Sequence, residues 1–198
     1  DGRGSAIAAG SQRILAGLGL WDSLSGDAGP ILEIRVADGD SPLFLHYDHK
    51  EIGDDPLGWI VENAVIRRAL ARAVSAADTD IFDGTELSAA DFGTDEAVLD
   101  LADGNRISAR LVIAADGRNS PLRETAGIEA VRWNYPQNGI VCSVHHEAPH
   151  HGIAQEHFLP AGPFAILPMT QNRSSIVWTE RSELAPGFMA MDDTDFAA

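Results

Sequence analysis

A continuous apolar run, Leu111 to Ala115, ends at Asp116-Gly117. Five apolar residues bounded by a turn signal are typical of a strand buried on both faces of a parallel sheet. In open α/β sheets, ligands bind outside the carboxyl ends of such strands. The run therefore predicts an α/β fold. It also places the Asp116 carboxylate where it can meet a hydroxyl of a ribose or ribityl group, or orient a cationic neighbour.

The residues after this run supply groups suited to a ligand site. Gly117 lets the backbone approach a ligand closely, and Ser120 can cap a short helix over 120–126. Arg123 carries a planar fork of donors, which can hold a phosphate or pair with Asp116. The alternative interpretation is that Asp116-Gly117 forms only a turn after a strand, and the dipeptide alone does not separate the two.

Hydrophobic periodicity divides the chain into an α/β part and a β-rich part. Apolar residues at helical spacing predict two longer helices, over 4–18 and 64–76, the second capped at Glu62-Asn63. Short apolar runs between turn residues predict strands, and Asp103-Gly104 is a strong hairpin signal. The expected strands cover 31–36, 43–47, 56–61, 82–87, 97–101, 106–109, 138–146, 154–159, 164–167 and 174–180. We expect a mixed α/β (α+β) architecture with two substructures.

Composition excludes several classes of protein. The 198 residues include 14 Lys and Arg against 30 Asp and Glu, a net charge of −16, so no basic stripe is available to neutralise phosphates. We therefore expect no nucleic-acid partner and no electrostatic docking to anionic lipid. The single cysteine, Cys142, excludes an intramolecular disulfide and a cysteine-based zinc site, which favours a reducing, cytoplasmic setting. No apolar run reaches the roughly eighteen residues of a membrane span.

Five histidines gather between positions 145 and 157, with Glu147 and Glu156 nearby. Imidazole is a common metal ligand, so a metal site is one interpretation of this cluster. Against it, His145 and His146 are neighbours on a predicted strand and point to opposite faces, and residues 149–152 are typical of an exposed turn. We therefore predict no metal site, and we expect Cys142 to be an inert core residue.

The segment from Ala102 to Arg123 resembles the second fingerprint of the flavoprotein aromatic hydroxylases, the FAD-dependent monooxygenases related to para-hydroxybenzoate hydroxylase. Other segments resemble the same family: the first residues around Arg3 and Ser5, the stretch around Asn63, and the strands from about 135 to 180. The resemblance covers nearly the whole chain. Within the family, the sequence is most similar to the hydroxylases of ubiquinone biosynthesis, which hydroxylate the ring of polyprenyl phenols.

The resemblance implies a fold and a cofactor. Residues 1–129 would form part of a Rossmann-like FAD-binding domain, with an inserted β segment near 30–60. Residues 130–198 would form a truncated, β-rich substrate domain. FAD would be reduced by NADH or NADPH, and the reaction would consume O₂. By their positions in the family's motifs, the expected FAD contacts are Arg3, Ser5, Asn63, Asp116, Gly117 and Arg123.

The resemblance also implies a substrate, a prenylated phenol or another small aromatic molecule. Tyr135, Phe158 and Phe164 are expected to line its site, with Trp178 as a further candidate; the alternative for each is sheet core. Nothing in the sequence singles out a catalytic base or the oligomeric state. Because the related enzymes act on lipid-tailed substrates, the resemblance implies peripheral contact of the cytoplasmic protein with the inner membrane.

Two motifs of the family are absent from the sequence. No Gly-x-Gly-x-x-Gly turn follows an initial strand, and no Gly-Asp motif with a Pro- and Gly-rich turn occurs late in the chain. We therefore expect an internal piece of a longer protein, inactive and weak in FAD binding by itself. The alternative is a non-catalytic binding or assembly module that keeps the substrate-domain sheet without a working flavin site.

Overall fold

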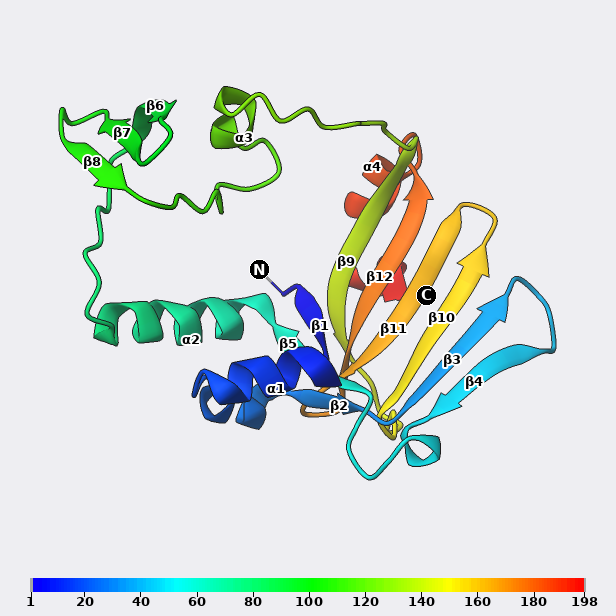
Figure 1. Ribbon diagram of the computed structural model, residues 1–198. Helices are drawn as coiled ribbons and strands as arrows, with labels where there is room; N and C mark the ends of the chain where they lie inside the picture. The colour runs from blue at the N-terminus through cyan, green and yellow to red at the C-terminus, as the bar shows by residue number, and fades with distance from the viewer. Residues whose placement is uncertain (1, 198) are drawn as a thin grey trace. The chain divides into compact units, whose positions relative to one another are not determined.

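The computed structural model describes residues 2–197, the last of them by its main chain only (Figure 1). Contacts divide the chain into two compact units, Asp1–Ala77 with Tyr135–Ala198, and Asp78–Asn134. The first unit joins distant parts of the sequence because strand β3 (Glu33–Asp38) pairs with strand β10 (Ile153–Leu159). The predicted domains 1–129 and 130–198 divide the chain differently, into a part that binds FAD and a part that binds the substrate. That functional division stays a prediction.

A small antiparallel sheet belongs to the first unit. Its strands are β1 (Gly4–Ala8), β5 (Gly58–Glu62) and β2 (Gly29–Ile31), in the order β1-β5-β2. The helices that pack with it are α1 (Ala9–Gly17) and α2 (Asn63–Ala76). Their shared core consists of Ile7, Leu24, Ala28, Val61, Val65 and Ala69.

The helix predicted over 4–18 is wrong for its first residues. The segment Gly4–Ala8 is extended and pairs with β5, from Gly4 opposite Glu62 to Ala8 opposite Gly58. Tertiary pairing overrides a helical spacing of apolar residues here, because propensity is only a weak local preference. The helix begins at Ala9. The second predicted helix is confirmed, with Glu62 at its N-cap.

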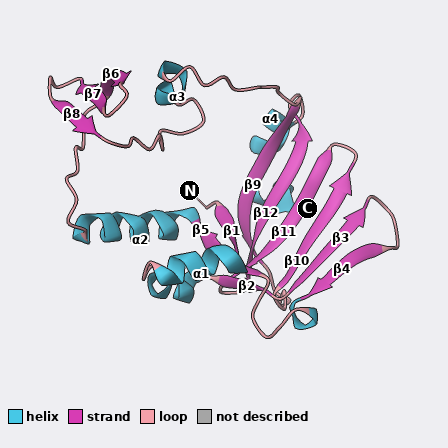
Figure 2. Cartoon of the chain, viewed as in Figure 1, coloured by secondary structure: helices cyan, strands magenta, loops and turns pink. Residues whose placement is uncertain are grey.

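A six-stranded sheet forms the rest of the first unit (Figure 2). Its order is β4-β3-β10-β11-β12-β9, and every neighbouring pair is antiparallel except β3 with β10, which is parallel. The four further strands are β4 (Phe44–Asp48), β9 (Gln137–His145), β11 (Gly162–Met169) and β12 (Arg173–Arg181). The strands predicted for this unit are confirmed, with ends displaced by at most about two residues.

One face of the large sheet carries a lateral row of side chains that crosses all six strands. Because directly paired residues share a face, the register places Glu156 in one row with five apolar residues. In strand order, the row is Leu45, Val36, Glu156, Ala165, Val177 and Val141. We call this side of the sheet the Glu156 face.

The opposite side, which we call the Trp178 face, is covered by aromatic packing. The ring of Trp178 lies 4.3 Å from that of Phe188 and 6.3 Å from that of Phe164, measured between centroids. Phe196 adds a third ring at 6.2 Å. Phe188 belongs to the short helix α4 (Ala185–Met189), and Phe196 belongs to the short helix α5 (Asp193–Ala197). These contacts cover part of the Trp178 face with partly buried aromatic side chains.

The small and large sheets meet where β2 approaches β11. A Cβ atom on Gly29 would lie 2.6 Å from the Pro168 carbonyl oxygen and 2.7 Å from the Cα of Met169, so only glycine fits there. Next to this approach, Ile31, Ile60, Ala154 and Met169 form a buried cluster that both sheets share. The cluster fixes the two sheets of the first unit against each other.

The second unit contains a three-stranded antiparallel sheet and one short helix. Its elements are β6 (Leu87–Phe92), β7 (Ala97–Leu101), β8 (Arg106–Ala109) and α3 (Pro121–Thr125). The predicted hairpin is confirmed, with Gly104 at a φ of 89° in its turn. The strand predicted over 82–87 is wrong, since β6 begins only at Leu87.

The buried parallel strand predicted over 111–115 is also wrong. These residues have no regular secondary structure, and Leu111 and Ile113 are 75% and 80% exposed. A strand of this type needs a neighbour on each edge and a layer on each face. Within residues 78–134, the sheet ends at β8, and no strand of that unit pairs with the run.

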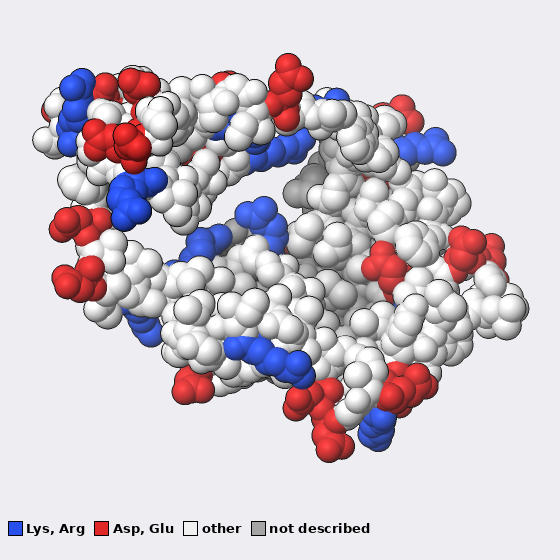
Figure 3. Space-filling view, viewed as in Figure 1, with Lys and Arg blue, Asp and Glu red and all other residues white. Residues whose placement is uncertain are grey.

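The remaining described segments are short. Three 3₁₀ helices cover Trp21–Ser23, Ser25–Asp27 and His49–Glu51. Among residues 2–197, none of the helices combines the length and apolarity needed to cross a bilayer. Basic side chains on the visible surface are interspersed with acidic ones (Figure 3).

Candidate functional site

Three of the residues expected to contact FAD converge where β1 begins and β5 ends. The backbone N–H of Asn63 donates to the carbonyl oxygen of Arg3 at 2.9 Å. The Ser5 hydroxyl donates to the Asn63 side-chain oxygen at 2.6 Å. Pairing of β1 with β5 brings these residues together, because β5 runs directly into α2, whose first residue is Asn63. The structure thus joins Arg3, Ser5 and Asn63 in one group, and their contact with FAD stays a prediction.

The first turn of α2 adds backbone donors to this group. Glu62 occupies the N-cap but makes no side-chain hydrogen bond to the helix. Its carboxylate instead pairs with Arg173, with Nη2 and Oε1 2.7 Å apart. The N–H groups at a helix start attract anions such as phosphate. The guanidinium, the amide and the helix N-terminus offer donors, and the Ser5 hydroxyl, whose proton is donated to Asn63, can accept a hydrogen bond. Such a set is suited to the phosphates and hydroxyls of FAD.

Two contacts place this group on the same side of the large sheet as the Glu156 face. Ser143, which lies on that face, donates its hydroxyl to the carbonyl oxygen of Gly2 at 2.8 Å. Arg173, on the same face at the start of β12, reaches Glu62 beside Asn63. The Glu156 face is therefore the side of the sheet that adjoins the expected cofactor contacts.

The residues predicted to line the substrate site do not share one surface. Phe158 lies on the Glu156 face and is half exposed, at 50%. Phe164 pairs with His157, so it lies on the Trp178 face in ring contact with Trp178. Tyr135 precedes β9 and is 67% exposed. Of these side chains, Phe158 is the one that lies on the same face of the sheet as Ser143 and Arg173, although in a different row.

Glu156 stands out in the sequence only as a neighbour of the histidine cluster. Its neighbours in the row are Val36 and Ala165, and burial raises the pKa of its carboxyl, with the nearby His157 acting in the opposite sense. The signal available in the sequence was the alternation Ala154, Glu156, Phe158, in which one charge interrupts the apolar side of a strand.

In the second unit, Asp116 organises the turn that leads into α3. Its carboxylate accepts the N–H of Leu122 at 3.2 Å, and the Ser120 hydroxyl accepts the N–H of Arg123 at 3.0 Å, which confirms the predicted cap. The hydrogen bond with the Ser120 side chain, then that with the Leu122 backbone, lowers the pKa of Asp116. Asp116 is therefore a carboxylate at neutral pH, already engaged by its own chain.

A hollow of about 370 Å³ lies beside this turn, within the second unit. Gly117, with a φ of 91°, and Arg123 line it together with Ser120 and apolar side chains such as Val112 and Leu122. The Arg123 guanidinium donates to the carbonyl oxygen of Arg118 at 3.2 Å rather than forming a fork on Asp116. The site expected at Asp116-Gly117 is thus a concave, largely apolar surface with a single cationic donor at its rim.

The histidine cluster makes structural hydrogen bonds. His146 bonds the Ala148 carbonyl oxygen at 2.6 Å and the Ser174 hydroxyl at 3.0 Å. His150 bonds the Met169 carbonyl oxygen at 2.8 Å and accepts the Gly152 N–H at 2.9 Å. Over residues 2–197, no three His, Cys, Asp or Glu side chains are grouped so as to hold a metal ion.

Comparison with known proteins connects these features to a family. A model of the FAD binding domain matches residues 1–187. The chain is 50% identical to "Ubiquinone hydroxylase UbiL" of Rhodospirillum rubrum, over all of the chain and 46% of that protein. It is 33% identical to the human "Ubiquinone biosynthesis monooxygenase COQ6, mitochondrial", over 98% of the chain and 44% of that protein. The chain therefore spans less than half the length of these curated relatives.

Solved structures show the same fold. PqsL, a probable FAD-dependent monooxygenase from Pseudomonas aeruginosa, superimposes with a TM-score of 0.79 at 18% identity. The match covers 96% of this chain and 54% of that protein. At this identity the likeness concerns the fold, and it confirms the predicted mixed α/β class.

Proposed function

This chain belongs to the FAD binding domain family, and we propose that the protein is an FAD-dependent monooxygenase that hydroxylates an aromatic ring. The observation that carries the proposal is the convergence of Arg3, Ser5 and Asn63 at the start of α2, which brings groups able to bond phosphates and hydroxyls to one place. When bound, FAD supplies the redox chemistry with O₂, which no amino-acid side chain can perform. The chain's part is to bind the cofactor and to present the substrate to it.

The substrate class we propose is a polyprenyl phenol of ubiquinone biosynthesis. Support comes from the names of two relatives, a ubiquinone hydroxylase and a ubiquinone biosynthesis monooxygenase. The exposed apolar side chains on the Glu156 face, Leu45 and Phe158 among them, provide a surface on which an aromatic ring and an apolar tail can rest. We further propose NADH or NADPH as the reductant, and peripheral contact of the cytoplasmic protein with the inner membrane.

Expression of the complete reading frame and its visible absorption spectrum test this proposal. We expect flavin absorbance to copurify with the protein or to reconstitute on addition of FAD. Bleaching by NADH or NADPH, and oxygen uptake that increases with an added prenylated phenol, are the further expected results. A protein that neither retains nor takes up flavin would contradict the proposal and would favour the non-catalytic module.

A variant in the second unit tests the expected contact at Asp116. Asp116→Ala removes the carboxylate that holds the turn before α3, so we expect weaker FAD retention or slower reduction of the flavin. Asp103→Ala, in the hairpin turn of the same unit, is the matched control. If the flavin content and the reduction rate of Asp116→Ala equal those of the control, Asp116 has no part in the cofactor site.

A further inference from the structure

The Glu156 face carries one ionisable side chain in the middle of an apolar row. Val36 lies beside Glu156 on β3 and Ala165 beside it on β11, while Ala154 and Phe158 lie before and after it along β10. Carboxylates are rarely placed among apolar neighbours unless they are paired or functional. Within the described residues, no hydrogen bond or ion pair satisfies the Glu156 carboxylate. The oxygens of the Glu156 carboxylate are therefore available to a ligand, because this side chain is only partly buried.

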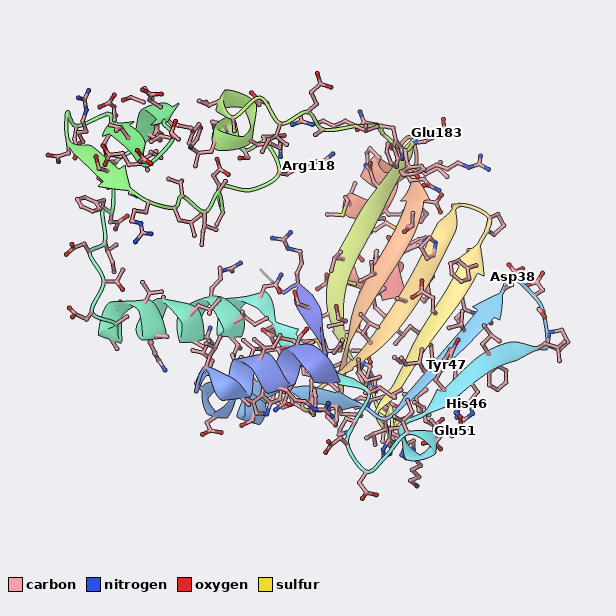
Figure 4. All side chains as sticks on the ribbon, viewed as in Figure 1. Asp38, His46, Tyr47, Glu51, Arg118 and Glu183 are labelled. Carbon is pink, nitrogen blue, oxygen red and sulfur yellow. The ribbon has the colours of Figure 1, made fainter. Side chains whose placement is uncertain are left out.

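The charged groups around Glu156 do not neutralise it. Asp38, labelled in Figure 4, lies at the end of β3 on the same face and is also acidic. Tyr47 belongs to the next row on β4, opposite Ile34, and β11 contributes no ionisable side chain. His157 points to the other face and attracts the carboxylate only through the sheet. Burial is therefore the dominant influence, and it raises the pKa of the Glu156 carboxyl above that of an exposed glutamate.

We propose that Glu156 is a catalytic residue that accepts a hydrogen bond from the phenolic hydroxyl of the substrate. The inference rests on the proposed function and adds the group that orients the ring. A phenol whose O–H is donated to a carboxylate gains electron density on its oxygen and on the ring carbons ortho and para to it. Those carbons are the positions at which a ring accepts an oxygen atom. The proton stays between the phenol oxygen and a Glu156 Oε atom, and no further group is needed for charge balance.

The apolar row explains why this hydrogen bond would discriminate between substrates. A charge-assisted hydrogen bond is strong when water is excluded, and the flanking Val36 and Ala165 side chains offer the carboxylate no competing donor. A bound ligand covers the carboxylate: one that brings a hydroxyl satisfies Glu156, whereas one that brings a methyl ether shields Glu156 from water and leaves it without a partner. A site built in this way rejects the analogue that lacks the donor.

The test compares 2-prenylphenol with its methyl ether on the complete reading frame. Binding is followed by tryptophan fluorescence, which requires no bound flavin. We expect the wild-type protein to prefer the phenol by roughly tenfold or more. Glu156→Leu should abolish the preference, and Glu156→Gln, which keeps an oxygen acceptor without the charge, should retain part of it. Glu51→Gln, a surface variant, is the control and should keep the full preference.

The pH dependence adds a readout that a purely structural role would not change. The preference requires the carboxylate, so it should rise as the pH increases through the raised pKa of Glu156 and fall away below it. Glu156→Gln should remove this dependence. Equal preference in wild type, Glu156→Leu and Glu156→Gln would overturn the inference, as would a wild-type protein without any preference. A protein that shows the preference without taking up flavin would keep the Glu156 site and overturn the proposed function instead.

Discussion

The Ser5 hydroxyl donates a 2.6 Å hydrogen bond to the side-chain oxygen of Asn63, across 58 positions of sequence. This contact joins the first strand of the chain to the first turn of α2. It also connects two residues whose roles were inferred separately from the family resemblance. To bind the phosphates and hydroxyls of one ligand, Ser5 and Asn63 must face the same place. Their hydrogen bond holds them in that arrangement.

A double-mutant cycle at Ser5 and Asn63 measures this contact. We expect Ser5→Ala and Asn63→Ala each to lower the free energy of unfolding by about 1 kcal/mol, because each removes one partly buried hydrogen bond. The double variant should lose less than the sum, with a coupling energy of about 1 kcal/mol, since both changes remove the same interaction. Chemical denaturation of the four proteins provides the measurement, and strict additivity would contradict the contact.

Replacing Gly29 tests the junction of the two sheets. Gly29→Ala puts a methyl group within 3 Å of the Pro168 and Met169 backbones, so either strand must move. We expect a loss of about 1 to 3 kcal/mol in the free energy of unfolding. Gly26→Ala is the control, because the methyl group that it adds would have open space within 4 Å. Equal melting temperatures for the two variants would show that β2 does not approach β11 so closely.

The two phenylalanines of the predicted substrate wall should behave differently. Phe164 packs against Trp178 on the covered face, so Phe164→Ala should cost about 2 kcal/mol of stability. Phe158 is half exposed on the Glu156 face, so Phe158→Ala should cost less stability but weaken binding of 2-prenylphenol. Thermal melts and fluorescence titrations measure the two effects. A loss of stability in Phe158→Ala together with a loss of binding in Phe164→Ala would contradict the roles that we assign to the two faces.

Acid should weaken the outer edge of the large sheet through Glu33. Hydrogen bonds from Arg35 at 2.8 Å and His46 at 3.0 Å lower the pKa of the Glu33 carboxyl. A carboxyl whose pKa is lower in the folded than in the unfolded protein stabilises the fold above the ordinary carboxyl range. That stabilisation disappears as the pH falls through the lowered pKa.

The corresponding experiment uses Glu33→Gln and a pH series. We expect the variant to melt below the wild type at pH 7, and the difference to shrink and vanish as the pH falls through the lowered pKa of Glu33. Glu51→Gln, on the exposed surface, is the control and should follow the wild type at every pH. A difference that persists unchanged in acid would show that the Glu33 contacts do not depend on its charge.

Most elements of the first unit were predictable because their signals are local. The alternating runs that form β3, β10 and β12, and the apolar stripe of α2, each carry the period of their structure within a few residues. Two of the failures share one physical cause. Residues 4–8 and 111–115 have patterns whose outcome depends on pairing partners elsewhere, and the first found a partner in β5 while the second has none within its unit.

By itself, the sequence determined the mixed α/β class, the acidic and membrane-span-free composition, the cap at Ser120, and which residues match the motifs of the FAD family. Only the tertiary structure decided which of those residues meet. It joined Ser5 to Asn63, separated Phe158 from Phe164 by one step of register, and isolated Glu156 in an apolar row. The reason is that the face on which a strand residue lies depends on alternation, but what lies beside it depends on long-range pairing.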